Sequence, residues 1–243
     1  MNLLLFEKQE SAYRIDKSDP RLDHVRNVLR SRVGDTLCIG VANGPKGTAR
    51  VEEILENQLL ISAEWEDAPP PPLPPIELWI ALPRPQTARK ILFEGTTIGV
   101  SAIRFFKAAR SDPAYARSSL WSTDEWRRCC WRGAEQAFDT RLPEVSTDES
   151  LDTCLQRAAP SATRWAMDVY ESNHALCEEE PGPAPLILAL GPERGWASND
   201  RSLLREHNFK LLHLGNRILR LETAALAALL IAQVRMQIGI AAA

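Results

Sequence analysis

The sequence predicts an α/β protein in which a small β-rich module precedes a larger domain with a mostly parallel sheet. First, six prolines fall within residues 66–75, and such a segment can form neither a helix nor a central strand. Second, short strand-like runs precede this segment. Third, strand-like and helix-like runs alternate after it, which is typical of a parallel sheet with crossover helices. We therefore expect a first module over residues 1–68, a proline-rich linker over 69–75 and a second domain over 76–243.

The first module is expected to hold one helix and three strands. Its apolar positions at helical spacing are Leu22, Val25, Val28 and Leu29. Arg26 and Arg30 lie one turn apart on another face of the same helix. Strands are expected at 36–42, 47–54 and 57–65, and the turn signal Asn-Gly-Pro-Lys-Gly joins the first two. Short strands at this spacing favour a small β-barrel or sandwich with one helix.

The second domain alternates between the two kinds of element. Strands are expected at residues 76–82, 102–109, 163–170, 185–191 and 210–215. Helices are expected at residues 87–100, 122–138, 151–157 and 200–208, and a last, alanine-rich helix ends near Met236. The second of these helices opens with a capping-box pattern from Ser122 to Glu125.

Composition excludes several classes of protein. No stretch approaches the roughly 18 uncharged apolar residues that span a membrane, and the N-terminal residues lack the basic flank of a signal peptide. The cytoplasm is therefore the expected compartment. Five cysteines, an odd number without CxxC spacing, argue against a disulfide framework and a structural zinc site. The four histidines are scattered and form no ligand pair, so we expect no metal site.

Charge is distributed unevenly along the chain, whose net charge is −3. Residues 83–141 hold eleven Lys and Arg against six Asp and Glu, whereas residues 1–75 and 142–243 are both acidic. A locally basic segment can bind phosphate groups even in an acidic protein. A solvated helix face accounts for the same charges, and on charge alone we favour that interpretation.

Two strand-to-helix junctions are candidates for a ligand site. The first is LALGPERGW, in which an apolar strand ends in the loop Gly191–Gly195, and the second is LLHLGNRILRLETAA. In open α/β sheets, ligands bind outside the carboxyl ends of strands, where backbone amides and helix starts are unpaired. Glycine allows the backbone to approach a ligand closely. A nucleotide-like ligand would have apolar contacts there, and Thr223 would cap the last helix. Two tight turns without a ligand remain the alternative.

Together the two junctions resemble the paired signature of the SPOUT-class 16S rRNA uridine-N3 methyltransferases. Members of that family usually carry a GPEGG loop and an LGxRILRxETA stretch, and this chain has LGPERGW and LGNRILRLETA. The segment DHVRNVLRSRVGD resembles the family's N-terminal PUA-like module, and IGVSAI and GAEQAFDTRLPEV resemble two further blocks. The resemblance covers nearly the whole chain, in order.

This resemblance implies a PUA-like β-barrel followed by a SPOUT α/β domain with a deep trefoil knot, a rare exception to the rule that chains do not knot. It implies S-adenosylmethionine as the cofactor, held by the loops Gly191–Gly195 and Leu214–Leu219. It also implies a homodimer with sites at the subunit interface, where the apolar surface Ala224–Ile231 would contact the partner, although the core of a monomer would explain that surface equally well. The expected cofactor-binding residues are Leu190, Gly191, Pro192, Glu193, Gly195, Leu214, Gly215, Arg217, Ile218, Leu219, Thr223 and Ala224.

The implied reaction makes demands on the residues near the cofactor. Uracil N3 is a weak nucleophile while it is protonated, so methyl transfer to it needs proton removal or stabilisation of the developing negative charge. Arg220 would stabilise that charge or hold a phosphate, and Glu222 would orient Arg220 or assist proton loss; both are expected catalytic residues. A salt bridge at a helix start is the alternative explanation of this pair.

A base that is methylated on its Watson–Crick edge must be unpaired or flipped out of the helix. The residues expected to contact RNA are Arg26, Arg30, Arg84, Arg110, Arg141 and Arg194. The chain departs from the family at several positions expected to face RNA. Arg194 replaces a glycine of the GPEGG loop, Glu94 and Thr97 replace a lysine and a glutamate, and Asp139 stands where arginine is common. The departures bear on the target nucleotide more than on the reaction.

The expected function is therefore S-adenosylmethionine-dependent methylation of N3 of a uridine in 16S rRNA. The expected partners are 16S rRNA or the 30S subunit and a second copy of the chain, with neither a membrane nor a metal. Two alternatives remain: a methyltransferase of the same scaffold with a different RNA target, and a non-catalytic RNA-binding protein.

Overall fold

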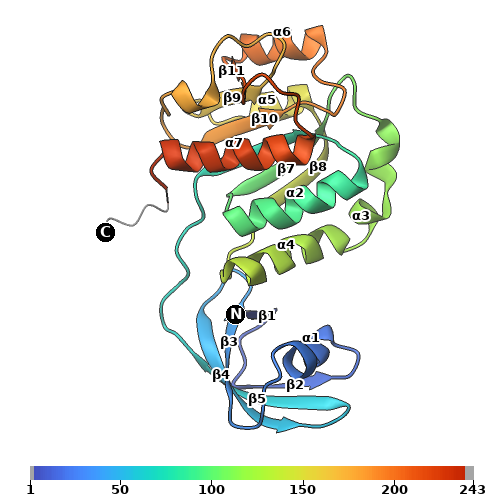
Figure 1. The fold of residues 1–243 in the computed structure, drawn as a ribbon, viewed down its shortest axis with the longest axis vertical. Coiled ribbons are helices and arrows are strands. Elements are labelled where there is room, and N and C mark those ends of the chain that lie inside the picture. Colours follow the sequence, from blue (N-terminus) through green and yellow to red (C-terminus); the bar gives the residue numbers. More distant parts are fainter. Residues whose placement is uncertain (1–2, 239–243) are drawn as a thin grey trace. The chain divides into compact units, whose positions relative to one another are not determined.

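The structure, a computed structural model, describes residues 3–238, which fall into two compact units (Figure 1). The first unit comprises the chain up to Pro72 together with the segment Ala134–Leu142, and the second comprises the rest. The division predicted from the sequence places the segment 134–142 in the second domain. In the structure Thr140 is buried, and its Oγ1 donates a hydrogen bond to the carbonyl of Gly44 at 2.7 Å. Residues distant in sequence thus complete the first unit.

Five strands of the first unit form one sheet, in the order β1-β3-β4-β5-β2. They are β1 (Leu4–Phe6), β2 (Ala12–Asp16), β3 (Thr36–Val41), β4 (Lys46–Ile54) and β5 (Gln58–Trp65). β1 and β3 run parallel, and the other neighbours run antiparallel. The three predicted strands are confirmed as β3, β4 and β5. The sequence pattern misses β1 because its three residues are all buried and show no alternation.

The helix predicted in the first unit consists of α1 (Pro20–Asp23) and a π-helical turn, η1 (His24–Val28). The backbone N–H of Leu29 donates to the carbonyl of His24, five residues earlier, at 2.9 Å. Leu22 and Val25 are buried as predicted, but Val28 is 65% exposed. Val28 therefore lies off the apolar stripe that α-helical spacing predicts, because the wider π turn changes that spacing.

Six parallel strands form the sheet of the second unit, in the order β11-β9-β10-β6-β7-β8. They are β6 (Ile76–Ala81), β7 (Ala102–Lys107), β8 (Glu144–Ser150), β9 (Thr163–Met167), β10 (Leu186–Leu190) and β11 (Lys210–Leu212). The predicted parallel sheet is confirmed, and β8 is an unpredicted strand at its edge. In the common doubly wound order the fourth strand adjoins the first, whereas here the fifth strand, β10, takes that place.

Helices cover both faces of this sheet. They are α2 (Pro85–Ile98), α3 (Ser119–Ser122), α4 (Glu125–Ala137), α5 (Leu151–Arg157), α6 (Ser198–Glu206) and α7 (Leu221–Arg235), with short 3₁₀ turns η2 (Pro113–Arg117) and η3 (Leu176–Glu178). α2 and α7 pack against each other on one face, and α5 and α6 lie on the opposite face (Figure 1). Among the described helices, none is long and apolar enough to cross a membrane.

The start of α4 differs from the predicted capping box. Ser122 is the last residue of α3, and the hydroxyl of Thr123 accepts a hydrogen bond from the backbone N–H of Glu125 at 3.2 Å. The prediction that Ser122 caps this helix is wrong, because a separate short helix already includes it.

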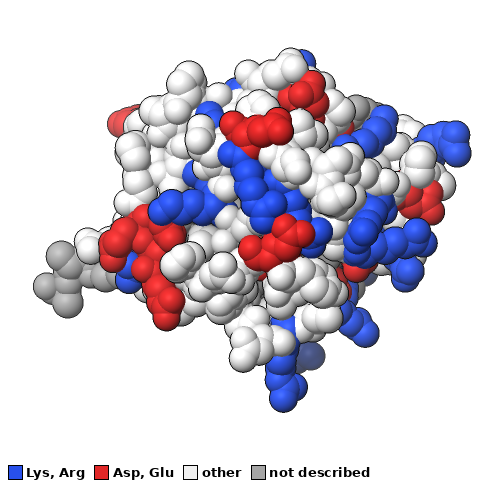
Figure 2. Space-filling model, turned by 90° about the horizontal axis from the view of Figure 1, so that it is seen from above, with Lys and Arg blue, Asp and Glu red and all other residues white. Residues whose placement is uncertain are grey.

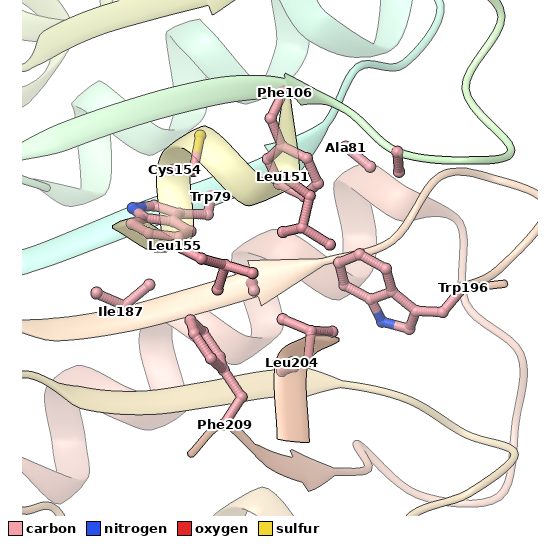
Figure 3. Close-up of a cluster of buried hydrophobic side chains, with 13 residues drawn as sticks. Trp79, Ala81, Phe106, Leu151, Cys154, Leu155, Ile187, Trp196, Leu204 and Phe209 are labelled. Carbon is pink, nitrogen blue, oxygen red and sulfur yellow. The ribbon is translucent and has the colours of Figure 1, made fainter. Parts of the chain in front are cut away.

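One hydrophobic cluster connects the sheet to α5 and α6. Leu151 and Leu155 of α5 and Leu204 of α6 gather with side chains of the central strands, and the cluster extends to Trp196 beyond the end of β10 (Figure 3). The rings of Trp196 and Phe106 lie nearly parallel, with centroids 6.1 Å apart. The loop that follows β10 is therefore anchored in the core.

We predict that Leu204→Ala lowers the free energy of unfolding by about 2–4 kcal/mol, because it leaves a cavity beneath α6. Urea unfolding followed by circular dichroism measures the change. Leu203→Ala is the matched control on the same helix, and it should cost less because Leu203 is only partly buried. Equal losses for both variants would contradict the packing described for α6.

Candidate functional site

A pocket of about 300 Å³ lies at the carboxyl ends of three neighbouring strands, β9, β10 and β11. Its walls are the segments that follow these strands and the start of α7. The lining residues are Met167, Asp168, Val169, Tyr170, Leu190, Gly191, Pro192, Glu193, Arg194, Gly195, Trp196, Arg201, Leu212, His213, Leu214, Gly215, Arg217, Ile218, Leu219, Leu221 and Ala224. The volume is at the lower end of the range for small-molecule sites. The position is the one at which open α/β sheets bind ligands.

The pocket brings together the residues that the sequence predicts for cofactor binding, with one exception. Thr223 does not line it. Thr223 also does not cap α7, because the N-cap is Arg220 and the helix begins at Leu221. Thr223 is instead an exposed residue in the first turn. The prediction that Thr223 caps α7 is wrong, because the helix begins about one turn earlier than expected.

The loop after β10 is shaped by Trp196. Its indole Nε1–H donates to the carbonyl of Met167, at the end of β9, at 2.9 Å. A Cβ on Gly191 would lie 2.9 Å from the Trp196 ring, so only glycine allows this close approach. Gly195 has φ +70°, which also favours glycine. The conformation of the loop therefore requires glycine at both positions, and the lack of side chains also leaves the backbone accessible.

A buried ion pair between Arg201 and Asp168 holds the loop after β10 in place. Arg201 of α6 donates through Nε to Asp168, which follows β9, and through Nη1 to the carbonyl of Trp196 at 3.0 Å. The side chains are 9% and 1% exposed. The hydrogen bond to Asp168 raises the pKa of Arg201, so the guanidinium stays charged. The backbone N–H of Tyr170 also donates to Asp168, at 2.7 Å.

The segment after β11 forms the opposite wall. The backbone N–H of Gly215 donates to Nδ1 of His213 at 3.0 Å, which makes that ring nitrogen an acceptor. His213 also exchanges backbone hydrogen bonds with His174 and Leu176, at 3.0 and 2.9 Å. The wall is thus fixed by main-chain contacts before the chain continues to Leu219 and α7.

Arg220 and Glu222, the expected catalytic residues, flank the pocket without lining it. Arg220 is exposed, directly after the lining residue Leu219. Glu222 forms an ion pair with Lys90 of α2, with Nζ and Oε1 3.3 Å apart. The pKa of Glu222 is lowered, first because its own backbone N–H donates to it and then because of Lys90, while partial burial opposes the shift. A lowered pKa makes the carboxylate a weaker base, which argues against a role in proton removal.

Three of the arginines expected to contact RNA come together beside the pocket. The backbone N–H of Arg84, the N-cap of α2, donates to the Glu193 carboxylate at 3.1 Å. Arg110, after β7, donates through Nη1 to the carbonyl of Arg194 at 3.1 Å. Viewed from the end that carries α6, basic side chains form several groups interrupted by acidic ones, rather than one continuous basic surface (Figure 2). The three arginines therefore form a small basic group beside the pocket and are not part of one continuous basic surface.

The other three arginines belong to the first unit. Arg26 donates to the carbonyl of Glu56 at 3.1 Å, and Arg30 is exposed two residues after η1. The guanidinium of Arg141 donates to the carbonyls of Pro70 and Pro71, at 3.0 and 3.3 Å. Arg141 thus joins the segment 134–142 to the proline-rich segment. These hydrogen bonds give Arg141 a structural role within the first unit, and its contact with RNA stays a prediction.

Two departures from the family signature also have structural roles. The hydroxyl of Thr97 donates to the carbonyls of Phe93 and Gly133, at 3.0 and 3.2 Å, and so links α2 to α4. The Asp139 carboxylate accepts hydrogen bonds from the backbone N–H groups of Thr140 and Arg141. Both side chains are thus engaged within the protein, and the expectation that these two positions face RNA stays a prediction.

The sequence prediction missed the wall that follows β9. It extended the strand to residue 170, which made Asp168 look like a strand residue, whereas β9 ends at Met167. The position of β9 beside β10 is the signal that could have found this wall, since parallel neighbours end at the same edge of the sheet. No group of three potential metal ligands occurs within residues 3–238.

We predict that Arg201→Met lowers the free energy of unfolding by about 3–5 kcal/mol, because it leaves Asp168 buried without its partner. The exposed pair of Arg205 and Glu171 is the matched control on the same helix, with Nη2 and Oε2 2.6 Å apart. Arg205→Met should cost about 1 kcal/mol or less. Guanidinium chloride unfolding measures both, and a similar small loss for both variants would show that the buried pair does not stabilise the site.

Comparisons with known proteins identify the family of this chain. The RNA methyltransferase domain family matches residues 69–233. The ribosomal RNA small subunit methyltransferase E of Treponema pallidum is 31% identical over 239 residues, which cover 94% of this chain and 89% of that protein. The protein of the same name from Synechocystis sp. is 27% identical, over 86% of this chain and 69% of that protein.

Solved structures share the fold. The ribosomal RNA small subunit methyltransferase E from Neisseria gonorrhoeae, bound to S-adenosyl methionine, superposes with a TM-score of 0.79 at 22% identity and covers 96% of this chain and 97% of its own. A probable rRNA-methyltransferase from Porphyromonas gingivalis also gives 0.79, at 20% identity, covering 98% of this chain and 99% of its own. From the matched domain and the Treponema relative, we conclude that the chain belongs to the RNA methyltransferase family of ribosomal RNA small subunit methyltransferase E.

Proposed function

We propose that this protein transfers a methyl group from S-adenosylmethionine to N3 of a uridine in 16S rRNA. The observation that carries the proposal is the pocket at the ends of β9, β10 and β11, in a chain that belongs to this family. The names of the relatives support a small-subunit rRNA substrate, and the bound ligand of the Neisseria structure supports the cofactor.

The residues of the pocket suit S-adenosylmethionine. Buried apolar side chains, among them Leu190, Leu212 and Trp196, provide contacts for a nucleoside. Gly191, Gly195 and Gly215 carry no side chain, so the backbone can lie close to a ligand at these positions. When bound, the cofactor would supply a methyl group already activated on a sulfonium. The protein would then hold the uracil, exclude water from the pocket and stabilise charge at N3.

Arg220 is the residue we propose for stabilising that charge. It follows the pocket wall directly and is exposed, so its guanidinium is accessible to a base bound at the mouth. We propose that Glu222 positions the start of α7 through Lys90 and takes no proton, since its lowered pKa makes the carboxylate a weaker base. The N3 proton of the neutral uracil would pass to solvent at the mouth of the pocket.

RNA would approach over the arginines beside the pocket. Arg84, Arg110 and Arg194 are exposed and come from the ends of β6, β7 and β10. Arg26 and Arg30 would extend the contact to the first unit, which we propose to be a PUA-like barrel. Phosphate contacts of this kind position the RNA without reading its sequence. Arg194 stands where the family has a glycine and lines the pocket itself, so we propose that it also bears on the choice of target nucleotide.

We also propose the remaining family features for this chain. The placement of β10 between β6 and β9 supports a trefoil knot formed by the segments after β10 and β11. A homodimer is supported by α7, where Leu230 and Val234 are 50% and 63% exposed while Ala225, Ala228 and Ala232 are buried. Work on ribosomal subunits would place the protein in the cytoplasm.

The function is tested with 30S subunits and with naked 16S rRNA as substrates for radiolabelled S-adenosylmethionine, followed by mapping of the modified base. We expect methyl on N3 of one uridine. Methyl on another base or another RNA would support a methyltransferase of the same scaffold with a different target. Methyl on none would support a non-catalytic RNA-binding protein. The cofactor alone should raise the melting temperature, because binding at about 100 times the dissociation constant adds about 2.7 kcal/mol. Ala224→Phe, which fills the pocket, should abolish that rise, whereas Ala227→Phe should not.

We predict that Arg220→Ala lowers kcat by about a hundredfold or more, because it removes a charge that acts on the transition state. Cofactor affinity, measured by calorimetry, should be kept. Glu222→Gln should retain most of the turnover, because Glu222 removes no proton in this proposal. Unchanged turnover in Arg220→Ala would remove that residue from the mechanism, and loss of turnover in Glu222→Gln without loss of stability would restore a proton-transfer role.

A further inference from the structure

Large apolar side chains gather at the mouth of the pocket. Among the pocket-lining residues, Tyr170 and Ile218 are 68% and 74% exposed, and Val169 and Leu219 are each 38% exposed. They come from the segments after β9 and β11, on two sides of the same opening. A group of exposed apolar residues at one site indicates an interaction, whereas single exposed residues do not.

Tyr170 is held in place rather than loosely attached. Its backbone N–H donates to Asp168 at 2.7 Å. Its ring carbon Cε2 lies 3.6 Å from where a Cβ on Gly195 would stand, so the ring lies beside the loop after β10. The guanidinium carbon of Arg201 is 6.0 Å from the ring centroid, within the range of a cation–π interaction. Because Arg201 is itself fixed by Asp168 and Trp196, the ring has a defined position at the mouth.

The surroundings of the ring fit a nucleobase with its phosphate. An aromatic face stacks on any base, and cations beside it hold the backbone. Arg194 and Arg217, both exposed, line the same opening. A base that undergoes methylation must leave its helix and be held outside it, which requires such a surface.

The exposure of the ring favours the substrate over the cofactor as its partner. The apolar residues deep in the pocket, Leu190, Leu212 and Trp196, are 2% exposed or less. A ligand buried in the pocket would contact these residues first. Tyr170 instead presents most of its surface to what arrives from solvent.

We propose that Tyr170 is the platform on which the target base stacks during methylation, and that Asp168 and Arg201 are positioning residues that hold its ring. This inference rests on the proposed function, since it names the residue that holds the base in that reaction. It also explains why an ion pair is buried beside the pocket although an apolar pair of similar volume would stabilise the fold as well.

The test compares Tyr170→Leu, which keeps apolar volume but removes the flat ring, with Tyr170→Phe, which keeps the ring. Tyr170→Leu should raise KM for the RNA substrate about tenfold or more, as expected for the loss of one stacking contact. Tyr170→Phe should restore a KM within about twofold of wild type, because stacking does not need the hydroxyl. Calorimetry should give the same dissociation constant for S-adenosylmethionine in all three proteins, and sedimentation should give the same mass.

Three results would overturn the proposal. An unchanged KM in Tyr170→Leu would show that the ring does not hold the base. A weaker dissociation constant for S-adenosylmethionine, with KM for RNA unchanged, would assign the ring to the cofactor. A change in mass would assign the apolar mouth to contacts between two copies of the chain.

A readout independent of turnover separates this proposal from the proposed function. Wild-type protein saturated with S-adenosylhomocysteine is irradiated with 16S rRNA that carries 5-iodouridine, and the crosslinked peptide is sequenced. We expect the crosslink at Tyr170. If the wild type methylates RNA but crosslinks only elsewhere, the inference fails while the function stands. If it crosslinks at Tyr170 but methylates no RNA, the function fails while the binding surface stands.

Discussion

The position of β10 at the centre of the sheet is the constraint on which the site depends. β10 is buried along its whole length, between β6 on one side and β9 on the other. A strand covered on both faces can only be apolar, so it contributes hydrogen bonds and packing and no chemistry. The polar residues that can contact a ligand come after the strand, in the loop that starts at Gly191. Because β6 and β9 run in the same direction, their carboxyl ends bring Arg84 and Asp168 to the two sides of that loop.

Several contacts hold the loop after β10 in place. Trp196 turns back into the core and reaches the end of β9 through its indole N–H. Arg201 then joins the backbone of Trp196 to the carboxylate of Asp168. On the other side, the Glu193 carboxylate accepts from the start of α2. A polar loop at a sheet edge would ordinarily be mobile, and these contacts explain how it can hold a defined pocket.

Much of this architecture could be predicted from local patterns. The parallel sheet followed from alternation, and the walls after β10 and β11 followed from glycine and the two signature stretches. The third wall could not be predicted, because nothing local shows that the strand containing Met167 stops before Asp168; its end is set by pairing with β10 and β11. The exposure of Val28 and the roles of Thr97 and Arg141 were missed for a related reason. Thr97 and Arg141 bind partners that are distant in sequence, and Val28 is turned outward by the hydrogen bond of the π turn. Residue spacing alone shows none of these contacts.

The segment Ala134–Leu142 has a consequence for how the protein can be divided. Thr140 and Arg141 make hydrogen bonds with Gly44 and the proline-rich segment, so the first unit is assembled from two stretches of chain separated by about sixty residues of the second. It is a discontinuous domain, not an independent N-terminal module. During synthesis it stays incomplete until the first part of the second unit has been made. Transplanting its leading stretch onto another enzyme would carry all five strands but leave out the segment that packs Thr140 against them, so an exchange of the first unit has to move both stretches together.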